Sequence, residues 1–288
     1  SLISMTSNNY RKLKDIYTNG NGVSIGRDLI KPCLEECKLY RRGTAFFSSS
    51  SLKSYADVIV DLIEKEVKLE ILCSPVIQDK KLIEILENNS TKEKRELVLK
   101  EAENILLSAV GLKNNPGDTD YRSEVLSYMI AKGQLEIKFA IPKDYETLPT
   151  DGNYDPLYHV KNGYFKFPNG DQVVFAGSFN ESRQGHVANR EGTQVFKSWI
   201  DGDKSRLKQT ANIVDSEWKG KEIDDLDIFP LDEEILKEIK KHAPSTPPKP
   251  PLPTPPPPPP PPPPEEYPLW QHQIDAIDKF IKKKHGIL

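Results

Sequence analysis

The dipeptide Asn169-Gly170 constrains the fold of this chain more than any other short stretch. A two-residue hairpin loop of type I′ needs a positive φ at both central residues, and Asn-Gly tolerates this best. The runs on either side, 158–167 and 172–176, are rich in aromatic and β-branched residues, as strands are. The sequence therefore predicts a β-hairpin with Pro168 opposite Asp171.

The predicted turn fixes which polar side chains of the two strands lie opposite each other. In the predicted register His159 is opposite Asn180, and Lys161 is opposite Ser178. Because side chains two residues apart in a strand share a face, all four groups should meet on one patch. Gly177 beside them lets a backbone or a ligand approach closely.

This set of side chains suits a phosphate ligand. A lysine neutralises a phosphoryl oxygen, and serine and asparagine donate hydrogen bonds to the other oxygens. The neutral imidazole of His159 can attack phosphorus near pH 7, and a carboxylate, for which Glu191 is the candidate, would orient the ring. The residues alone leave a second interpretation open, which is an ordinary hairpin with polar surface residues.

Three short motifs in this stretch resemble the HxK…GSxN…E signature of the phospholipase D superfamily. They are His159-x-Lys161, Gly177-Ser178-x-Asn180 and Asn189-x-Glu191. The surrounding residues are similar to the branch of this superfamily that is fused to DNA helicases in bacterial restriction and defence proteins. The resemblance spans residues 26–218. It implies an α/β fold, a mixed β-sheet flanked by helices, with one HxK motif in each chain.

The resemblance also implies a role for each motif residue. His159 would form a covalent phosphohistidine, and Glu191 would support it. Lys161, Ser178 and Asn180 would hold the phosphate. The resemblance further implies that cleavage needs no metal and no other cofactor.

One position departs from the family pattern. The superfamily has an aspartate five residues after the lysine of HxK, and this chain has Lys166 there. The predicted register puts Lys166 on the face opposite His159, so the site need not be lost with the aspartate. Asp171 lies in the turn and is not expected to replace it. The departure keeps an alternative open, in which a catalytically degraded domain serves as a dimerisation or DNA-binding module.

Cleavage through a phosphohistidine needs a second acid that protonates the leaving oxygen. Phospholipase D-type sites take this acid from a second HxK motif, but the other four histidines of this chain have no lysine two residues later. We therefore expect the second half-site from another copy of the chain. The result would be a C2 homodimer in which two His159 side chains face each other across the axis.

Composition limits the classes of function. The formal net charge is −3 and the pI is near 6.0, so DNA would have to bind at a local basic groove. No apolar run approaches the ~18 residues of a membrane helix, and no signal peptide opens the chain. A cytoplasmic protein without membrane contact is therefore expected. These features weigh against a further alternative, a lipid phosphodiesterase, which liposome turnover would test.

The three cysteines are too few for a disulfide framework. Cys33 and Cys37 lie one helical turn apart, without a second pair of cysteine or histidine ligands at metal-binding spacing. They are expected to be core thiols rather than zinc ligands.

Hydrophobic periodicity predicts alternating strands and helices. A strand at 44–51, a helix at 52–66 and a strand at 67–73 indicate a βαβ unit and a partly parallel sheet. A further strand is expected at 135–141. Further helices are expected at 27–40, 79–87, 92–110, 121–132, 204–218 and 232–242.

Composition also predicts the domain boundaries. We expect an N-terminal leader at 1–24, the nuclease domain at 25–220 and a helical extension at 221–243. Residues 244–264 hold 16 of the 25 prolines and should form a polyproline II spacer. At ~3.1 Å per residue the spacer would be about 65 Å long. An SH3-type ligand is the alternative for this segment.

Residues 265–288 are similar to the start of a superfamily 2 helicase. Gln273-x-x-Ala276-Ile277 resembles the adenine-reading Q-motif, and the terminal Gly-Ile-Leu resembles the strand before the phosphate-binding loop. The loop itself, GxxxxGK[ST], is absent, so ATP and an adenine contact by Gln273 are expected only in a longer protein. An unrelated C-terminal helix is the other interpretation.

Together the motifs predict a metal-independent DNA endonuclease. It would be the N-terminal nuclease part of a helicase–nuclease protein in restriction or antiviral defence. DNA is the expected partner, and a methyltransferase or specificity subunit is a further candidate.

Overall fold

The structure is a computed structural model, and it describes residues 8–20, 22–47, 60–75, 91–113, 120–143, 161–178, 192–221, 225–249 and 275. The chain divides into two compact units, residues 1–250 and 251–288. Asp275 is the one described residue of the second unit. Most of the predicted proline spacer and the helicase-like segment with Gln273 therefore lie outside the described residues.

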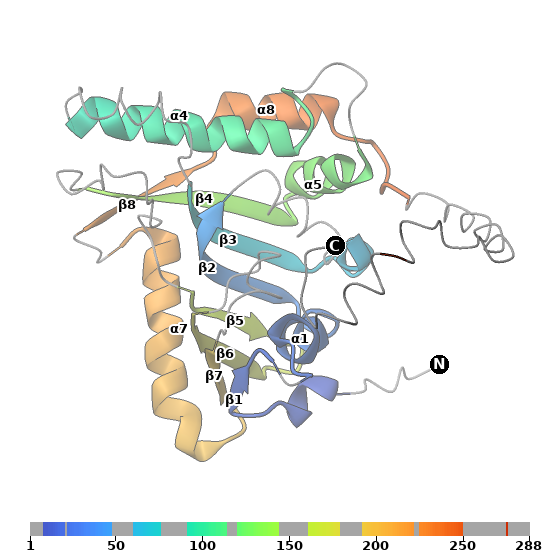
Figure 1. Cartoon of the computed structure of the whole chain (residues 1–288), viewed down its shortest axis with the longest axis vertical. Helices are drawn as coiled ribbons and strands as arrows, with labels where there is room; N and C mark the ends of the chain where they lie inside the picture. Colours follow the sequence, from blue (N-terminus) through green and yellow to red (C-terminus); the bar gives the residue numbers. More distant parts are fainter. Residues whose placement is uncertain are drawn as a thin grey trace, which may run out of the picture. The chain divides into compact units, whose positions relative to one another are not determined.

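A mixed sheet of eight described strands forms the centre of the first unit (Figure 1), in the order β1-β7-β6-β5-β2-β3-β4-β8. β2, β3 and β4 run parallel to one another, and every other neighbouring pair is antiparallel. The predicted partly parallel sheet is confirmed, but the strand predicted at 44–51 is β2 and begins five residues earlier, and residues 48–59 of the predicted βαβ unit lie outside the described residues. The strands are β1 (Ile16–Thr18), β2 (Leu39–Phe47), β3 (Lys68–Pro75), β4 (Leu135–Pro142), β5 (Gly163–Lys166), β6 (Gln172–Gly177), β7 (Gly192–Lys197) and β8 (Leu226–Pro230).

Helices cover both faces of this sheet (Figure 1). One face carries α7, which packs along β5, β6 and β7. On the other face α4 and α5 contact β4, and α8 packs against both helices. The predicted α/β class with a mixed sheet flanked by helices is confirmed. The helices are α1 (Lys31–Leu34), α4 (Thr91–Ala109), α5 (Tyr121–Ala131), α7 (Lys204–Lys219) and α8 (Glu233–His242), with short turns η1 (Asn9–Lys12), η2 (Gly26–Ile30), η3 (Val60–Leu62) and η4 (Asp201–Asp203).

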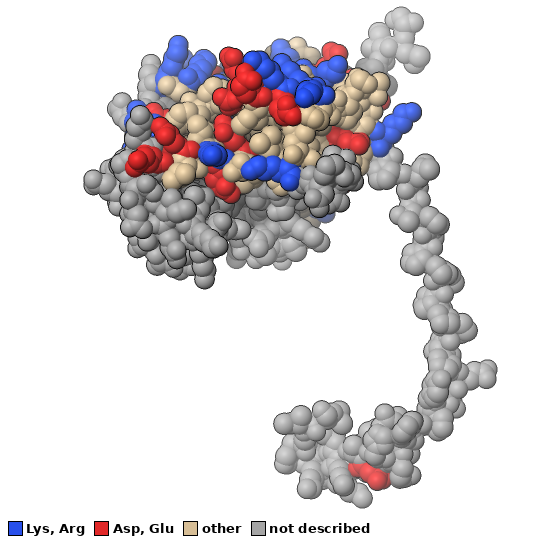
Figure 2. Space-filling model, turned by 90° about the horizontal axis from the view of Figure 1, so that it is seen from above, with Lys and Arg blue, Asp and Glu red and all other residues tan. Residues whose placement is uncertain are grey.

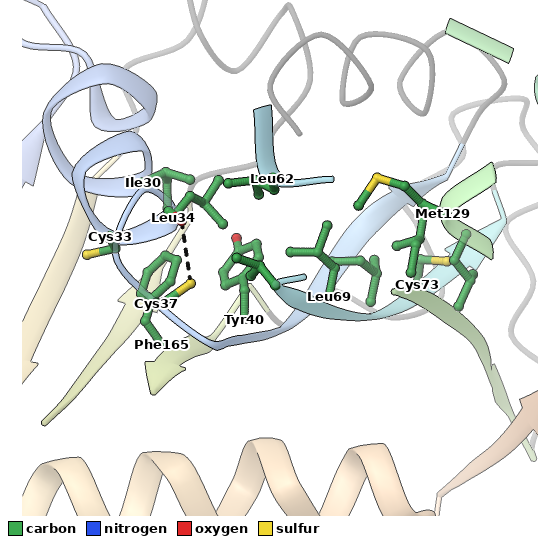
Figure 3. Close-up of a cluster of buried hydrophobic side chains, with 14 of the residues drawn as sticks. Ile30, Cys33, Leu34, Cys37, Tyr40, Leu62, Leu69, Cys73, Met129 and Phe165 are labelled. Atoms are coloured by element: carbon green, nitrogen blue, oxygen red, sulfur yellow. Dashed lines mark hydrogen bonds between the residues drawn. The ribbon is translucent and has the colours of Figure 1, made fainter. Parts of the chain in front are cut away.

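The largest core cluster lies on the face covered by α1, α4 and α5 (Figure 3). Tyr40 of β2 and Phe165 of β5 stack in it with ring centroids 4.5 Å apart. The thiols of Cys33 and Cys37 are buried and free in the same cluster, which confirms the prediction of core thiols. Burial raises the pKa of Cys37 to about 12, because a thiolate would lose its hydration there.

A partly buried ionic network fixes α7 to the opposite face. The Arg41 guanidinium of β2 contacts Glu70 of β3 and Asp215 of α7, each at 2.5 Å. The Tyr164 hydroxyl of β5 donates to the same Asp215 carboxylate at 2.7 Å. Three strands and one helix therefore share one set of charge-assisted hydrogen bonds.

The long helices and strands that the sequence predicts are confirmed, but the predicted bounds of one helix are wrong. The helices predicted at 92–110, 121–132, 204–218 and 232–242 are α4, α5, α7 and α8, and the strands at 67–73 and 135–141 are β3 and β4. The helix predicted at 27–40 instead consists of the π-helical turn η2 and the single turn α1, because Leu39 and Tyr40 belong to β2. The helix predicted at 79–87 and most of the one at 52–66 lie outside the described residues.

The structure adds three strands that periodicity did not indicate, namely β1, β7 and β8. β1 comes from the segment that was expected to be a leader, and it pairs with β7. In the same segment Tyr10 is buried against Phe167, with ring centroids 3.7 Å apart. Residues 8–20 therefore contribute to the folded unit.

Within the described part of the chain, no helix combines the length and the apolar character that crossing a lipid bilayer requires. The face seen in Figure 2 carries lysine and arginine interspersed with aspartate and glutamate.

Candidate functional site

Three neighbouring strands present their motif-bearing ends at one edge of the sheet. Lys161 lies two residues before β5 begins, Ser178 directly follows the end of β6, and β7 begins at Gly192, directly after Glu191. β6 is antiparallel to both β5 and β7. The start of β5, the end of β6 and the start of β7 are therefore adjacent, which brings the described motif residues Lys161 and Ser178 to the same edge as Gly192, the first residue after Glu191.

The same edge holds the carboxyl ends of the parallel strands. β5 is antiparallel to β2, so the start of β5 lies beside the end of β2, and β3 and β4 end in the same direction. The backbone of residue 162 continues this pairing, because its carbonyl accepts from the Gly43 amide at 2.9 Å. Ligands of open α/β sheets bind outside the carboxyl ends of the strands. Lys161 and Ser178 therefore lie at the edge where a ligand site is expected.

The hairpin that positions two of these strands has a longer loop than predicted. Gly163 pairs with Phe175 and Lys166 pairs with Gln172. The Phe167 amide donates to the Asp171 carbonyl at 3.0 Å, so the loop is Pro168-Asn169-Gly170, three residues. Gly170 has φ 90°, whereas Asn169 is not among the residues with positive φ. A turn closed by one left-handed glycine has replaced the predicted type I′ turn.

The longer loop shifts the register by one residue. Continued by two residues beyond Gly163, the observed register places Lys161 opposite Gly177 rather than Ser178. The predicted Lys161–Ser178 pair is therefore wrong, because Pro168 belongs to the loop and every later pair is shifted by one residue. The predicted partners His159 and Asn180 both lie outside the described residues, as does Glu191.

Ser178 is held by the backbone at the start of β7. Its amide donates to the Gly192 carbonyl at 3.0 Å, and its hydroxyl oxygen accepts from the Gly192 amide at 3.1 Å. Glu191 is bonded covalently to Gly192. These two hydrogen bonds therefore bring the serine of GSxN within one residue of the glutamate motif.

Gly177 is required by the close approach of β7. A Cβ atom at this position would lie 2.1 Å from the Gly192 carbonyl oxygen and 2.7 Å from the Thr193 Cα. Both are backbone atoms that cannot move aside without separating the strands. The predicted close backbone approach at Gly177 is confirmed, and the approaching backbone is β7.

Two cationic side chains are buried near this edge. Lys161 is 5% exposed and Arg42 of β2 is 1% exposed. Arg42 is paired with Gly163, and its guanidinium lies 5.4 Å from the centroid of the Phe175 ring. Because Lys161 is two residues from Gly163, it shares a face with Arg42 on the neighbouring strand. Two buried cations on one face give this edge a local positive field.

Sequence reasoning missed Arg42 and Thr193. Arg42 falls between the helix predicted at 27–40 and the strand predicted at 44–51 and belongs to no motif, and Thr193 follows the glutamate motif by two residues. Thr193 is 3% exposed, and its hydroxyl has no hydrogen-bond partner among the residues that the structure describes. Only the three-dimensional pairing of the strands places these two side chains beside the motifs.

Lys166 and Asp171 both lie away from this edge. The Lys166 ammonium is 4.8 Å from the centroid of the Tyr164 ring, on the face that α7 covers. The Asp171 carboxylate accepts hydrogen bonds from the Tyr10 hydroxyl at 2.9 Å and from Arg11 at 2.7 Å. Asp171 therefore fastens the N-terminal segment to the hairpin.

A metal site would need several ligands close together. Among the described residues, no three histidine, cysteine, aspartate or glutamate side chains are grouped so that they could hold a metal ion.

Comparison with known proteins gives similar structures but no relatives in sequence. No family model matches the chain, and no curated protein matches it. Among solved structures, Nuc from Salmonella typhimurium, a phospholipase D family member, is 16% identical with a TM-score of 0.33, covering 68% of this chain and 90% of Nuc. NucT from Helicobacter pylori is 12% identical with a TM-score of 0.33, covering 68% of this chain and 94% of NucT. At this level of similarity the comparison does not identify the function of the chain.

Proposed function

We propose that this chain is a phosphodiesterase of the phospholipase D type, and specifically a metal-independent DNA endonuclease. The observation that supports the proposal is that Lys161, Ser178 and Gly192, each of which belongs to one of the three motif segments or directly follows it, lie at adjacent strand ends on one edge of the sheet. Motifs that were scattered by chance would not be expected at three adjacent strand ends. The buried cations Lys161 and Arg42 at the same edge support an anionic ligand.

The proposed reaction has two steps. In the first, the His159 imidazole attacks phosphorus, a P–N bond forms, and the P–O bond to the leaving strand breaks. In the second, water attacks the phosphohistidine and loses a proton to the group that protonated the leaving strand, a P–O bond forms, the P–N bond breaks, and His159 is regenerated. Lys161 would neutralise a phosphoryl oxygen throughout, and Ser178 and Asn180 would orient the phosphate. Glu191 would hold the imidazole in its reactive tautomer.

The first step leaves an alkoxide that must receive a proton. A second histidine at the same phosphate would supply it, and each chain has one HxK motif. The proposed functional unit is therefore a C2 homodimer in which His159 of one copy attacks and His159 of the other donates the proton.

The proposal includes the setting of the domain. The proline spacer would tether the nuclease to a helicase motor, where Gln273 would contact ATP. A restriction or antiviral role in the cytoplasm, with a methyltransferase or specificity subunit, follows from the resemblance of the motifs and their surroundings. Gln273 and most of the spacer lie beyond residue 249, where the described part of the first unit ends.

One observation favours a second candidate function. Lys166 occupies the position where the superfamily has an aspartate, and its side chain lies against Tyr164 rather than at the motif-bearing edge. A domain that had lost catalysis would still dimerise or bind DNA. In this alternative the two buried cations bind the DNA backbone without cleavage.

Cleavage in the presence of EDTA tests the proposal. The wild-type chain should cut plasmid or single-stranded DNA in excess EDTA, and His159→Ala should lose at least about 1,000-fold in rate, because the nucleophile is gone. Lys166→Ala is the matched control, a lysine of the same hairpin on the other face, and it should keep the wild-type rate. Cleavage that survives His159→Ala would contradict the proposal. Binding without cleavage by the wild type would favour the second candidate.

A further inference from the structure

Thr193 is a buried polar side chain whose hydroxyl does not stabilise the described part of the fold through a hydrogen bond. Its hydroxyl is inaccessible to solvent and finds no hydrogen-bond partner among the described residues. Ser178, the neighbouring hydroxyl, contrasts with it, because its oxygen accepts from the Gly192 amide at 3.1 Å. A buried donor without a partner costs folding free energy, so native chains seldom keep one without another use.

Strand pairing fixes where this hydroxyl lies. Thr193 is opposite Gly177 of β6 and opposite Tyr17 of β1. Its Oγ1 is 2.9 Å from the point where a Cβ of Gly177 would be. The hydroxyl therefore leans toward β6, over a position that has no side chain.

Lys161 lies in the same row across the sheet. The observed register of β5 and β6, continued by two residues, places Lys161 opposite Gly177. Neighbouring strands are about 4.8 Å apart, so the Cα atoms of Lys161 and Thr193 are about 10 Å apart with only glycine between them. A cation and a hydroxyl donor on either side of a glycine can bind two oxygens of one oxyanion.

We propose that the Thr193 hydroxyl donates a hydrogen bond to a non-bridging oxygen of the phosphate that Lys161 holds. The inference rests on the proposed function and adds a phosphate-binding residue that the HxK, GSxN and glutamate motifs do not contain. Because the hydroxyl is buried, only a small group that enters the edge of the sheet beside Lys161 reaches it. The contact is therefore with the phosphate and not with a base, and it favours no DNA sequence.

Two substitutions separate the hydroxyl from the shape of the side chain. Thr193→Val replaces the hydroxyl with a methyl group of similar size, so the chain should fold and melt at the wild-type temperature or slightly above it. Its kcat/KM for single-stranded DNA in EDTA should fall about tenfold or more, because a hydrogen bond to a charged group is lost. Thr193→Ser keeps the hydroxyl and should stay within about threefold of the wild type. Thr18→Val removes an exposed threonine hydroxyl of β1 and is the matched control.

A binding measurement keeps this test separate from the proposed cleavage. A labelled single-stranded oligonucleotide is titrated into His159→Ala and into the double variant His159→Ala/Thr193→Val, with fluorescence anisotropy as the readout. The double variant should bind at least about fivefold more weakly, with a salt dependence that is unchanged because no charge is removed.

The two measurements distinguish a failure of the proposed cleavage from a failure of the proposed threonine contact. A wild type that does not cut DNA, with binding that still weakens on loss of the hydroxyl, would end the proposed cleavage and support the phosphate contact. Equal kcat/KM and equal affinity with and without the hydroxyl would overturn the inference while leaving the nuclease intact. Absence of both cleavage and binding would overturn both.

Discussion

At position 177 the backbone of β7 comes closer to β6 than a methyl group allows. The cause is visible in two contacts, since a Cβ atom there would lie 2.1 Å from the Gly192 carbonyl and 2.7 Å from the Thr193 Cα. Gly163 on β5 is restricted in a different way, because a Cβ atom would lie 2.6 Å from Cζ of the Phe175 ring. Two glycines thus permit the tight packing of three strands beside the motifs.

Gly177→Ala should therefore damage both stability and activity. The added methyl group meets backbone atoms, so β6 and β7 must separate and the hydrogen bonds between Ser178 and Gly192 must lengthen. We expect a loss of about 2 kcal/mol or more in the free energy of unfolding, measured with urea, together with loss of DNA cleavage.

Gly202→Ala is the matched control for this prediction. A Cβ atom at Gly202 has no neighbour within 4 Å, and the backbone there does not have a positive φ. The substitution should leave the urea midpoint and the cleavage rate unchanged. Equal midpoints for the two alanine variants would contradict the assignment of a close approach at Gly177.

The residues of the candidate site show how far a sequence can fix a register. The identity of the hairpin strands and of its turn residues follows from Asn169 and Gly170, and both strands are present. The loop length does not follow, because Asn-Gly fits a two-residue turn and also the end of a three-residue turn. Tyr10 resolves the choice in the structure, since its hydroxyl accepts from the Asn169 amide at 2.9 Å and donates to Asp171. That contact joins residues 159 positions apart and leaves no local signal.

Among the elements, length separates those that periodicity predicts from those it misses. α4 has 19 residues and α7 has 16, long enough for several turns of apolar spacing. β1 has three residues, of which Tyr17 alone is buried, so it shows no alternation that can be counted. The predicted helix at 27–40 failed because Tyr40 fits a helical spacing, yet gains more by stacking on Phe165 within the sheet.

The N-terminal segment is held to the hairpin mainly through Asp171. Partial burial raises the pKa of this carboxyl, but hydrogen bonds from Arg11, Tyr10 and Asn169 outweigh it and leave the pKa below its ordinary value. A carboxyl whose pKa is lowered on folding stabilises the folded state at pH values above its unfolded pKa. This contribution is complete above about pH 5 and is lost as the pH falls through the lowered folded value.

Asp171→Asn should therefore reduce stability in a pH-dependent way. At pH 7 the variant should be less stable by about 1 kcal/mol, because the pair with a half-exposed Arg11 is weakened. The difference from the wild type should shrink as the pH falls from 5 toward 3, which urea unfolding at several pH values would measure. Asp225→Asn, at an exposed aspartate near β8, should show no such trend. A difference that stays constant with pH would show that the carboxylate charge is not what fastens the segment.

At the scale of the whole molecule, charge gives no general attraction to DNA. The formal net charge is −3, and the described face seen in Figure 2 mixes both signs. In the proposed function, local cations such as Lys161 and Arg42, which are buried on neighbouring strands at one edge of the sheet, would provide the attraction to DNA. A domain of this kind would gain affinity if two copies acted on one DNA molecule, which fits the homodimer that we propose.

The proposed dimer predicts a particular response to mixing. The native mass should be twice the 32.6 kDa of one chain. If wild-type and His159→Ala chains are mixed in equal amounts and exchange subunits, about a quarter of the dimers carry two histidines. Cleavage should then fall to about a quarter of the rate that the same total chain concentration gives as pure wild type, because a dimer with one histidine has a nucleophile but no acid, or the reverse.

Mixing with Lys166→Ala provides the matched control, since Lys166 lies on the face away from the motifs. That mixture should keep the full rate. A wild-type and His159→Ala mixture that retains about half of the rate would mean that each chain cleaves independently, and a native mass of 32.6 kDa would mean the same. Either result would place the second acid within the chain, and a histidine outside the HxK motif would then be the group to substitute next.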